Sequence, residues 1–406
     1  MNINLKKYKS SVKALFLILG FVILFGCTES FEIENDRIEN FLVINATVTD
    51  QIGNQRIVLS RTFGFGEDPI PEEGASIVIL ENEVTEYQFN ENSSGEYLSI
   101  RAFAVTAGNE YRLSVRTANG RSYTSEKVIA PQPTSIDRIY VKRVVNDQGT
   151  DGVGVFLDAF DPTGNSLYYR HEFEETHRVK APDWINQDLV TDNSTGTITF
   201  GLVRRPEEQK VCYVTKKSNT INIVNNEGLI EDRLQNLKMN FIPVNDIRIA
   251  DRYSILVKQY VQTREANKFY KVLSDFSGSE NLFSQIQPGF IRGNVFSETD
   301  VNENVVGFFD VSSVAEQRIF FNRDEFITDV PPFELDCEEI IIKRLRLEGD
   351  AEFRVRLNTL IILNKVRLLV IPSFPINQGS VLTFVPRVCG DCTAIGESEV
   401  PEFWID

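Results

Sequence analysis

FLVINATVT, residues 41–49, is the stretch of sequence that decides the fold. Apolar and polar residues alternate along it, as they do in a strand with one buried face. Similar short segments, each bounded by turn residues, recur at intervals typical of a β-sandwich. These segments are residues 56–60, 75–80, 97–101, 110–116 and 124–129. Residues 39–130 are therefore predicted to form an immunoglobulin-like β-sandwich.

Pro131 and Pro133 interrupt this pattern. Neither proline can donate a hydrogen bond to a strand ladder, so the pair marks the predicted domain boundary. Alternating segments then resume, and residues 134–406 are predicted to form a second sandwich, similar to a fibronectin type III domain. The predicted strands are residues 135–145, 153–158, 167–173, 220–224, 253–261, 339–343, 360–363 and 366–371. The expected fold class is all-β, with two β-sandwich domains.

One helical insertion is expected near residues 263–275. Ala266, Phe269, Tyr270 and Leu273 follow one another at spacings of three and four, which places them on one face of a helix. Thr263 is suited to cap its start. We expect this short helix to cover one edge or end of the second sandwich, ahead of a C-terminal segment that contains cysteines.

The charge of the chain limits its partners. Its 406 residues carry a formal net charge of −16 and are 42% hydrophobic. The first 26 residues hold four lysines and no acidic residue, so the charge becomes −20 once they are removed. Such a field repels nucleic acid, which we therefore exclude as a partner. The length is enough for a sizeable core and for two or three domains.

The N-terminus has the pattern of an export signal. Four lysines precede an apolar run over residues 14–25, which is too short to span a bilayer. The run ends at Gly26-Cys27, which resembles a bacterial lipobox. Residues 1–26 are predicted to be a signal peptide and Cys27 the lipidated residue, although a signal-anchor helix is the alternative. The acidic linker at residues 27–38 resembles signals that send Bacteroidetes lipoproteins to the cell surface, or serves only as a solvated linker.

Four further cysteines invite a structural interpretation. Outside the inner membrane an even number of cysteines favours disulfides, although the sequence leaves three connectivities open. The most favourable bridges would tie the C-terminal segment to Cys212 and Cys337, because closing a long loop constrains the unfolded chain most. A redox site at Cys389-Gly-Asp-Cys392 and a four-cysteine zinc site are the alternatives. No amphipathic helix follows the motif, which argues against redox catalysis.

No motif in the chain indicates a catalytic centre. His171 and His177 are the two histidines, and with Glu175 they would share a strand face. An exposed polar strand edge is expected there, with a surface metal site as the alternative. Residues 146–152 resemble a calcium loop but lack its distal glutamate, so a hairpin turn is expected. A pair of glycosidase carboxylates is defined by its spacing in space and stays open. We predict no enzyme activity, cofactor or metal.

Exposed aromatic residues are the candidate contacts for a ligand or partner. Phe63 and Phe65 lie in a Gly-rich loop, where core packing would not obviously place them. The alternative is that one phenylalanine closes the end of the sandwich. Trp184 follows Ala-Pro-Asp and is a further candidate contact.

The chain resembles one family in particular, the uncharacterised Bacteroidetes lipoproteins called domain of unknown function 4249. The resemblance covers almost the whole chain beyond the signal peptide. It rests on residues 41–46, 61–62, 253–260, 283, 293–294, 306–321, 389–393 and 401–404. The family has no assigned catalytic residues. It does imply a context, because such lipoproteins are often encoded beside TonB-dependent outer-membrane receptors.

These observations lead to one functional hypothesis. We expect an outer-membrane lipoprotein, lipid-anchored through Cys27 and facing the cell exterior. It would act without enzyme activity as an accessory or ligand-binding partner of a TonB-dependent transporter in nutrient uptake. The ligand is not identified by the sequence. A structural or adhesive envelope protein is the alternative, and a hydrolase on a β-scaffold is a second one.

Overall fold

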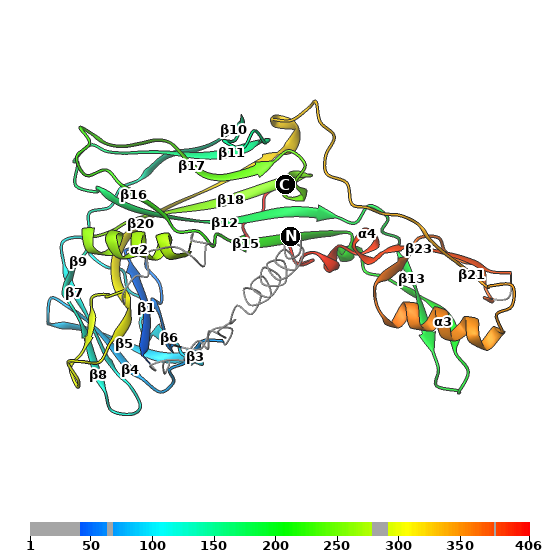
Figure 1. The fold of residues 1–406 in the computed structure, drawn as a ribbon, viewed down its shortest axis with the longest axis horizontal. Helices are drawn as coiled ribbons and strands as arrows, with labels where there is room; N and C mark the ends of the chain where they lie inside the picture. Colours follow the sequence, from blue (N-terminus) through cyan, green and yellow to red (C-terminus); the bar gives the residue numbers. More distant parts are fainter. Residues whose placement is uncertain (1–40, 63–67, 278–290, 377–378) are drawn as a thin grey trace, which may run out of the picture.

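The computed structural model describes residues 41–62, 68–277, 291–376 and 379–406. These residues are mostly strand and form several sheets, which confirms the all-β prediction. They fold into three lobes, and the two outer lobes project to the same side of the central one (Figure 1). Among the helices of the described residues, none is long and apolar enough to cross a membrane.

The N-terminal lobe, residues 41–130 with 295–312, curls one sheet around an apolar core. Its strands follow the order β20-β1-β2-β6-β5-β4-β7-β8-β19, with β3 beside β2 and β9 beside β7. The strands are β1 (Leu42–Thr49), β2 (Arg56–Arg61), β3 (Ile70–Pro71), β4 (Ser76–Glu81), β5 (Thr85–Ser93), β6 (Glu96–Ser99), β7 (Glu110–Arg116), β8 (Ser122–Ser125), β9 (Val128–Ile129), β19 (Val295–Ser297) and the first half of β20 (Val305–Asn322).

The central lobe packs two sheets face to face around a second core. One sheet has the order β10-β11-β17, and the other has β15-β12-β18-β20. The strands are β10 (Ile136–Val145), β11 (Asp151–Asp161), β12 (Tyr168–Lys180), β15 (Val211–Lys217), β16 (Asn222–Asn225), β17 (Asp232–Pro243), β18 (Arg252–Val261) and the second half of β20. Short 3₁₀ turns are η1 (Glu207–Gln209), η2 (Ile247–Ile249) and η3 (Arg323–Glu325).

The third lobe, residues 185–204 with 338–386, has a small core of its own. A hairpin and helix α3 pack there with the sheet β21-β23-β22. Its elements are β13 (Gln187–Asp192), β14 (Thr199–Arg204), β21 (Ile340–Lys343), α3 (Asp350–Ile362), β22 (Val366–Leu368) and β23 (Val381–Pro386). Helix α4 (Arg387–Gly390) and the 3₁₀ turn η4 (Cys392–Ala394) lie at the joint with the central lobe. The last residues return to the central lobe, where Trp404 packs against Tyr213 and Phe320.

Strand β20 belongs to two lobes at once. Its residues 305–312 pair in parallel with β1, and its residues 313–322 pair in antiparallel with β18. Asp50, which follows β1, accepts hydrogen bonds from the backbone N–H of Val314 (2.8 Å) and the hydroxyl of Ser313 (2.5 Å). The carboxylate thus completes the ladder at the residue where β20 changes partners.

This sharing differs from the predicted division into residues 39–130 and 134–406. Val295, Val305, Phe309 and Val311 lie in the same core as the strands before residue 130. No strand was predicted over residues 295–322, and the sequence pattern does not show that this segment pairs with residues more than 200 positions away. The third lobe was likewise not separated from the second sandwich.

Two local predictions have different outcomes. Helix α2 (Arg264–Ser277) confirms the predicted helix, and the Thr263 hydroxyl accepts a hydrogen bond from the Ala266 N–H at 3.2 Å. The predicted strand over residues 360–363 is wrong, because these residues end α3. A run of four apolar residues fits a buried strand or the side of a helix equally well.

The face with the two histidines is buried instead of exposed. Strand β12 lies between β15 and β18, and its inner face looks toward β17. His171 Nε2 donates one hydrogen bond to the amide oxygen of Gln259 at 3.2 Å. Burial lowers the pKa of His171 and of His177 to about 4, so both imidazoles are neutral at neutral pH. The expectation of an exposed polar edge is therefore wrong.

Gly307 allows β20 to approach β1 closely. Its φ is +109°, and a Cβ atom there would lie 1.9 Å from the carbonyl oxygen of Ile44. A Cβ at Gly293 would lie 1.5 Å from the Gly307 oxygen. Beside it, the Asn294 amide donates to the Phe309 oxygen at 2.9 Å and accepts from the Phe309 N–H at 2.8 Å. The two glycines therefore pack backbone against backbone.

The substitution Gly307→Ala should destabilise the protein by about 3 kcal/mol or more, because the methyl group collides with the backbone of β1. Gly120→Ala is the matched control, since Gly120 also has a positive φ (+86°) but has no atom within 4 Å of the added Cβ. The control should cost about 1 kcal/mol. Urea unfolding followed by circular dichroism measures both, and equal losses would show that the close approach contributes nothing.

Candidate functional site

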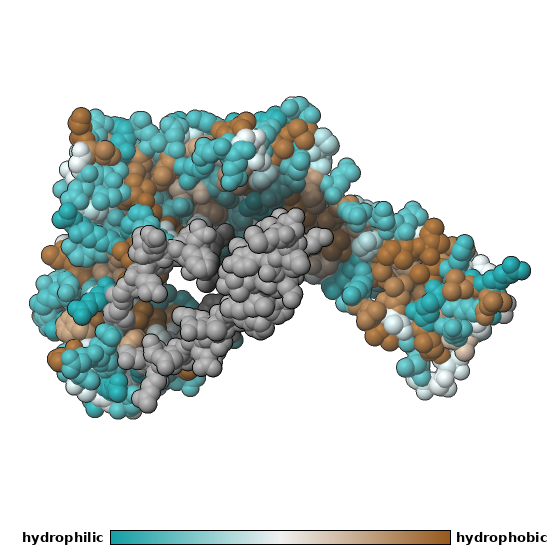
Figure 2. All heavy atoms as spheres, in the orientation of Figure 1, coloured by the Kyte–Doolittle hydropathy of each residue, from teal (hydrophilic) through white to brown (hydrophobic). Residues whose placement is uncertain are grey.

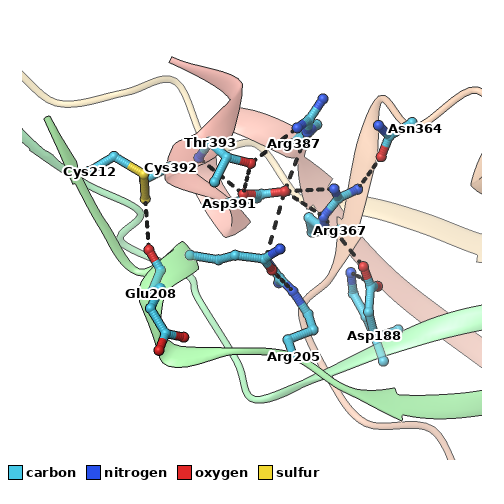
Figure 3. Close-up of polar contacts among 12 residues, drawn as sticks. Asp188, Arg205, Glu208, Cys212, Asn364, Arg367, Arg387, Asp391, Cys392 and Thr393 are labelled. Atoms are coloured by element: carbon cyan, nitrogen blue, oxygen red, sulfur yellow. Dashed lines mark hydrogen bonds and ion pairs between the residues drawn. A yellow bond between two sulfur atoms is a disulfide. The ribbon is translucent and has the colours of Figure 1, made fainter. Parts of the chain in front are cut away.

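The candidate site is the joint between the central lobe and the third lobe, where the C-terminal cysteine loop lies (Figure 3). Two disulfides meet there, Cys212–Cys392 and Cys337–Cys389. Cys212 comes from β15, and Cys337 precedes β21. The prediction that these cysteines form disulfides to the C-terminal segment is confirmed, and the structure supplies the pairing that the sequence left open.

The disulfide pairing attaches the third lobe to the central lobe. The two bridges span 180 and 52 residues of sequence. Bridges over such distances remove conformational freedom mainly from the unfolded chain, typically worth about 2–4 kcal/mol each. Because Cys389 and Cys392 are neighbours, both bridges fasten the same short loop. The third lobe is thereby held to the end of the long central sheet.

The same pairing bears on the alternatives for the cysteine motif. Cys389 and Cys392 are bonded to different partners and are almost completely buried, so the motif does not form the internal disulfide of a redox site. One ligand atom each from Asp183, Cys337 and Cys389 lie within 4.8 Å of one another. Two of these three atoms are the sulfurs of a disulfide, and metal binding requires thiolates.

Asp391, inside the cysteine motif, organises the polar contacts of the joint. Its side chain is 1% exposed and accepts hydrogen bonds from the Thr393 hydroxyl at 2.6 Å and Arg367 Nη2 at 2.6 Å. Arg387 Nε lies 3.3 Å from the same carboxylate. Burial alone would raise the pKa of Asp391, but these hydrogen bonds and the charge of Arg367 outweigh it and hold the pKa below its ordinary value.

Arg205 completes the cluster from the other side. It follows β14 and is 5% exposed, and its Nη2 lies 3.9 Å from the Asp391 carboxylate. Its Nε donates to Gln209 at 2.9 Å, whereas its two terminal nitrogens make no hydrogen bond within the described residues. Burial lowers the pKa of Arg205, and the charge of Arg367 adds to this effect. Asp188 balances part of the positive charge, 3.4 Å from Arg367 Nε.

The cluster was not predicted from the sequence. Its arginines lie at positions 205, 367 and 387, far apart along the chain and without a common motif. The one local signal was Asp391, an acidic residue between two cysteines. Disulfide pairing and the fold of the third lobe are needed before the three arginines meet.

Trp184 is brought to this joint as well. Its ring packs against the apolar cluster that contains Cys212 and Cys392, together with Val214 and Ile395. The Nζ of Lys210 lies 6.0 Å from its centroid. Trp184 therefore contributes to the packing of the joint, and its role as a partner contact stays a prediction. Cys27, Phe63 and Phe65 lie outside the described residues.

A cavity of about 430 Å³ adjoins the Cys337–Cys389 bridge. The segment 332–337 covers it from one side, and the end of β12 and η2 line the other. Its lining mixes charged groups, among them Arg178, Lys180 and Asp251, with apolar ones such as Phe333. This volume lies in the range of small-molecule sites.

Comparison with known proteins places this architecture in a family. The model of the family described as domain of unknown function (DUF4249) matches residues 28–318. The chain belongs to this family. The match ends inside β20, so most of the third lobe and three of the disulfide cysteines lie beyond it. The resemblance that the sequence suggested extended as far as residue 404.

Other comparisons add little to the DUF4249 assignment. No curated protein matches the chain. Among solved structures, a DUF4785 family protein from Legionella pneumophila is similar at 9% sequence identity and a TM-score of 0.18. The similarity covers 49% of this chain and 56% of that one. A similarity at this level does not establish a shared fold or function.

Asp391→Asn should destabilise the joint by about 3 kcal/mol, because it leaves three guanidinium groups around a neutral amide in a buried place. Trp184 lies at the joint, so its fluorescence during urea unfolding is a suitable measurement. Asp350→Asn is the matched control, since Asp350 forms a half-exposed ion pair with Arg354 that contributes at most about 1 kcal/mol. A loss at Asp391 no larger than at Asp350 would contradict a structural role for the cluster.

Proposed function

We propose that this DUF4249 protein is an outer-membrane lipoprotein that faces the cell exterior and acts as a non-enzymatic partner of a TonB-dependent transporter. The proposal rests on the sequence of its N-terminus, with Cys27 as the lipid anchor, and on one structural observation. That observation is the apolar outer surface of the third lobe. Exposing apolar side chains to water is unfavourable, so such a surface favours a bound partner.

Helix α3 carries this observation. Its inner face buries Phe353 and Leu357 in the core of the lobe. Its outer face also holds apolar residues, because Val355 is 54% exposed and Ile362 is 65% exposed. A helix that covers a core is normally polar on its outer face. A helix with apolar residues on both faces is typically buried on both. A partner that covers the outer face would account for this composition.

The rest of the third lobe extends the apolar surface. Figure 2 shows hydrophobic residues gathered on this lobe, whereas polar residues predominate on the visible face of the central lobe. Contiguous apolar patches on soluble proteins commonly mark interaction sites. The exposed apolar residues of the lobe are Val190, Val203, Ile341, Leu345, Leu347, Val355, Ile362, Leu363, Val370, Ile371, Phe374 and Val381.

The joint makes this surface suitable for docking. The third lobe is fixed to the central lobe by two disulfides and by the Asp391 cluster, so its outer face is presented in a defined orientation. A preorganised surface loses less conformational entropy when it binds. The N-terminal lobe lies at the far end of the molecule, and its first strand, β1, follows the linker after Cys27 in the sequence. The proposed anchor therefore joins a different lobe from the one that carries the docking surface.

Co-purification in mild detergent tests the proposal. The wild-type protein should bring down a β-barrel receptor, and the double variant Val355→Glu/Ile362→Glu should recover at least about tenfold less, because two charges would be buried in the interface. The matched control is Ile52→Glu/Ile230→Glu, which adds the same charge at exposed apolar residues of the other lobes. No receptor with the wild-type protein, or equal recovery with all three, would contradict the proposal.

A further inference from the structure

A second cavity, of about 640 Å³, lies at one edge of the central lobe, beside β15 and β17, which are edge strands of its two sheets. Strand β12, the end of β15, the loop to β16, and β17 line it. It is separate from the joint, whose cavity is lined by other residues. Its volume also lies in the range of small-molecule sites.

The charge of this cavity is opposite to that of the chain. Lys216, Lys217, Lys238 and Arg248 line it, and Glu175 is its one acidic residue. Glu175 is already paired, since both of its oxygens lie 3.2 Å from Arg248 Nη1. A chain with a net charge of −16 therefore keeps a local excess of positive charge at one cavity. Such a field attracts anions and raises their local concentration.

The three lysines are available to a ligand. Within the described residues, none of them forms an ion pair or a side-chain hydrogen bond, although acidic residues are abundant elsewhere on the surface. Arg248, in contrast, is fully engaged by Glu175 and by Asp246 at 2.8 Å. The charge of Arg248 is therefore neutralised within the protein. The positive charge that a ligand could contact comes from the three lysines.

The uncharged lining narrows the class of ligand. Asn219 and Asn222 offer amides that both donate and accept hydrogen bonds, which suits hydroxyl groups. Phe173 and Phe241 present partly exposed aromatic rings, which suit an apolar ring face. Cations, amides and aromatic rings together match a ligand that carries carboxylates, hydroxyls and C–H faces. We infer that this cavity binds an acidic oligosaccharide, with uronate carboxylates held by the three lysines.

This inference names a ligand for the proposed uptake role and rests on it for its biological meaning, but its test needs no transporter. Isothermal titration of the purified full chain with oligogalacturonate should show binding that weakens as salt is added. A neutral maltooligosaccharide of the same length should bind much more weakly. An oligoglutamate of equal charge tests whether the charge alone is recognised.

The variant Lys216→Gln/Lys217→Gln/Lys238→Gln should bind oligogalacturonate about tenfold or more weakly. The matched control is Lys268→Gln/Lys343→Gln/Lys365→Gln, which removes the same charge at exposed lysines away from the cavity and should bind like the wild-type protein. Thermal unfolding by circular dichroism shows whether both variants are folded. No binding by the wild-type protein, an equal loss in the control, or tighter binding of oligoglutamate would overturn the inference.

Discussion

The parallel pairing of β1 with β20 is the contact on which the other features depend. One strand of 18 residues completes the sheet of the N-terminal lobe and then the sheet of the central lobe. At the change of partner, the buried carboxylate of Asp310 accepts hydrogen bonds from Gln262 at 2.7 Å and Ser312 at 2.9 Å. Helix α2 covers this region, with Phe269 against Phe308. The continuous strand and the buried hydrogen bonds of Asp310 together fix the position of the N-terminal lobe relative to the central lobe.

The joint between the central lobe and the third lobe is stabilised by other interactions. Within the part of the chain that the structure describes, the third lobe shares no strand with the central lobe, and two disulfides and one buried carboxylate hold it instead. Burying Asp391 among arginines costs desolvation free energy, which the hydrogen bonds from Thr393 and Arg367 offset. The result is a lobe with a small core and a rigid attachment. Its exposed apolar surface is the basis of the proposed partnership, and the lysine-lined cavity lies in the central lobe between the two outer ones.

The sequence predicted the local features well and the distant ones poorly. Alternation along residues 41–49 identified β1, and the spacing of Ala266, Phe269 and Tyr270 identified α2, because both signals are contained in neighbouring residues. The partner of β1, which begins at Val305, has no local signal. The cysteines predicted disulfides, but Arg205 and Arg367 meet Asp391 only after the third lobe has folded. The apolar run at residues 360–363 is too short to distinguish a buried strand from a helix, and in the structure it lies at the end of α3, which packs against the core of the third lobe.

Site-specific photo-crosslinking in intact cells tests the central claim most directly. A photoreactive amino acid replaces Val355 on the outer face of α3, and in a second strain it replaces Ile230 on the central lobe, which is fully exposed. If the third lobe is the docking surface, position 355 should form an adduct with an outer-membrane β-barrel receptor, and position 230 should not. An adduct at position 230 alone, or none at position 355, would contradict the claim.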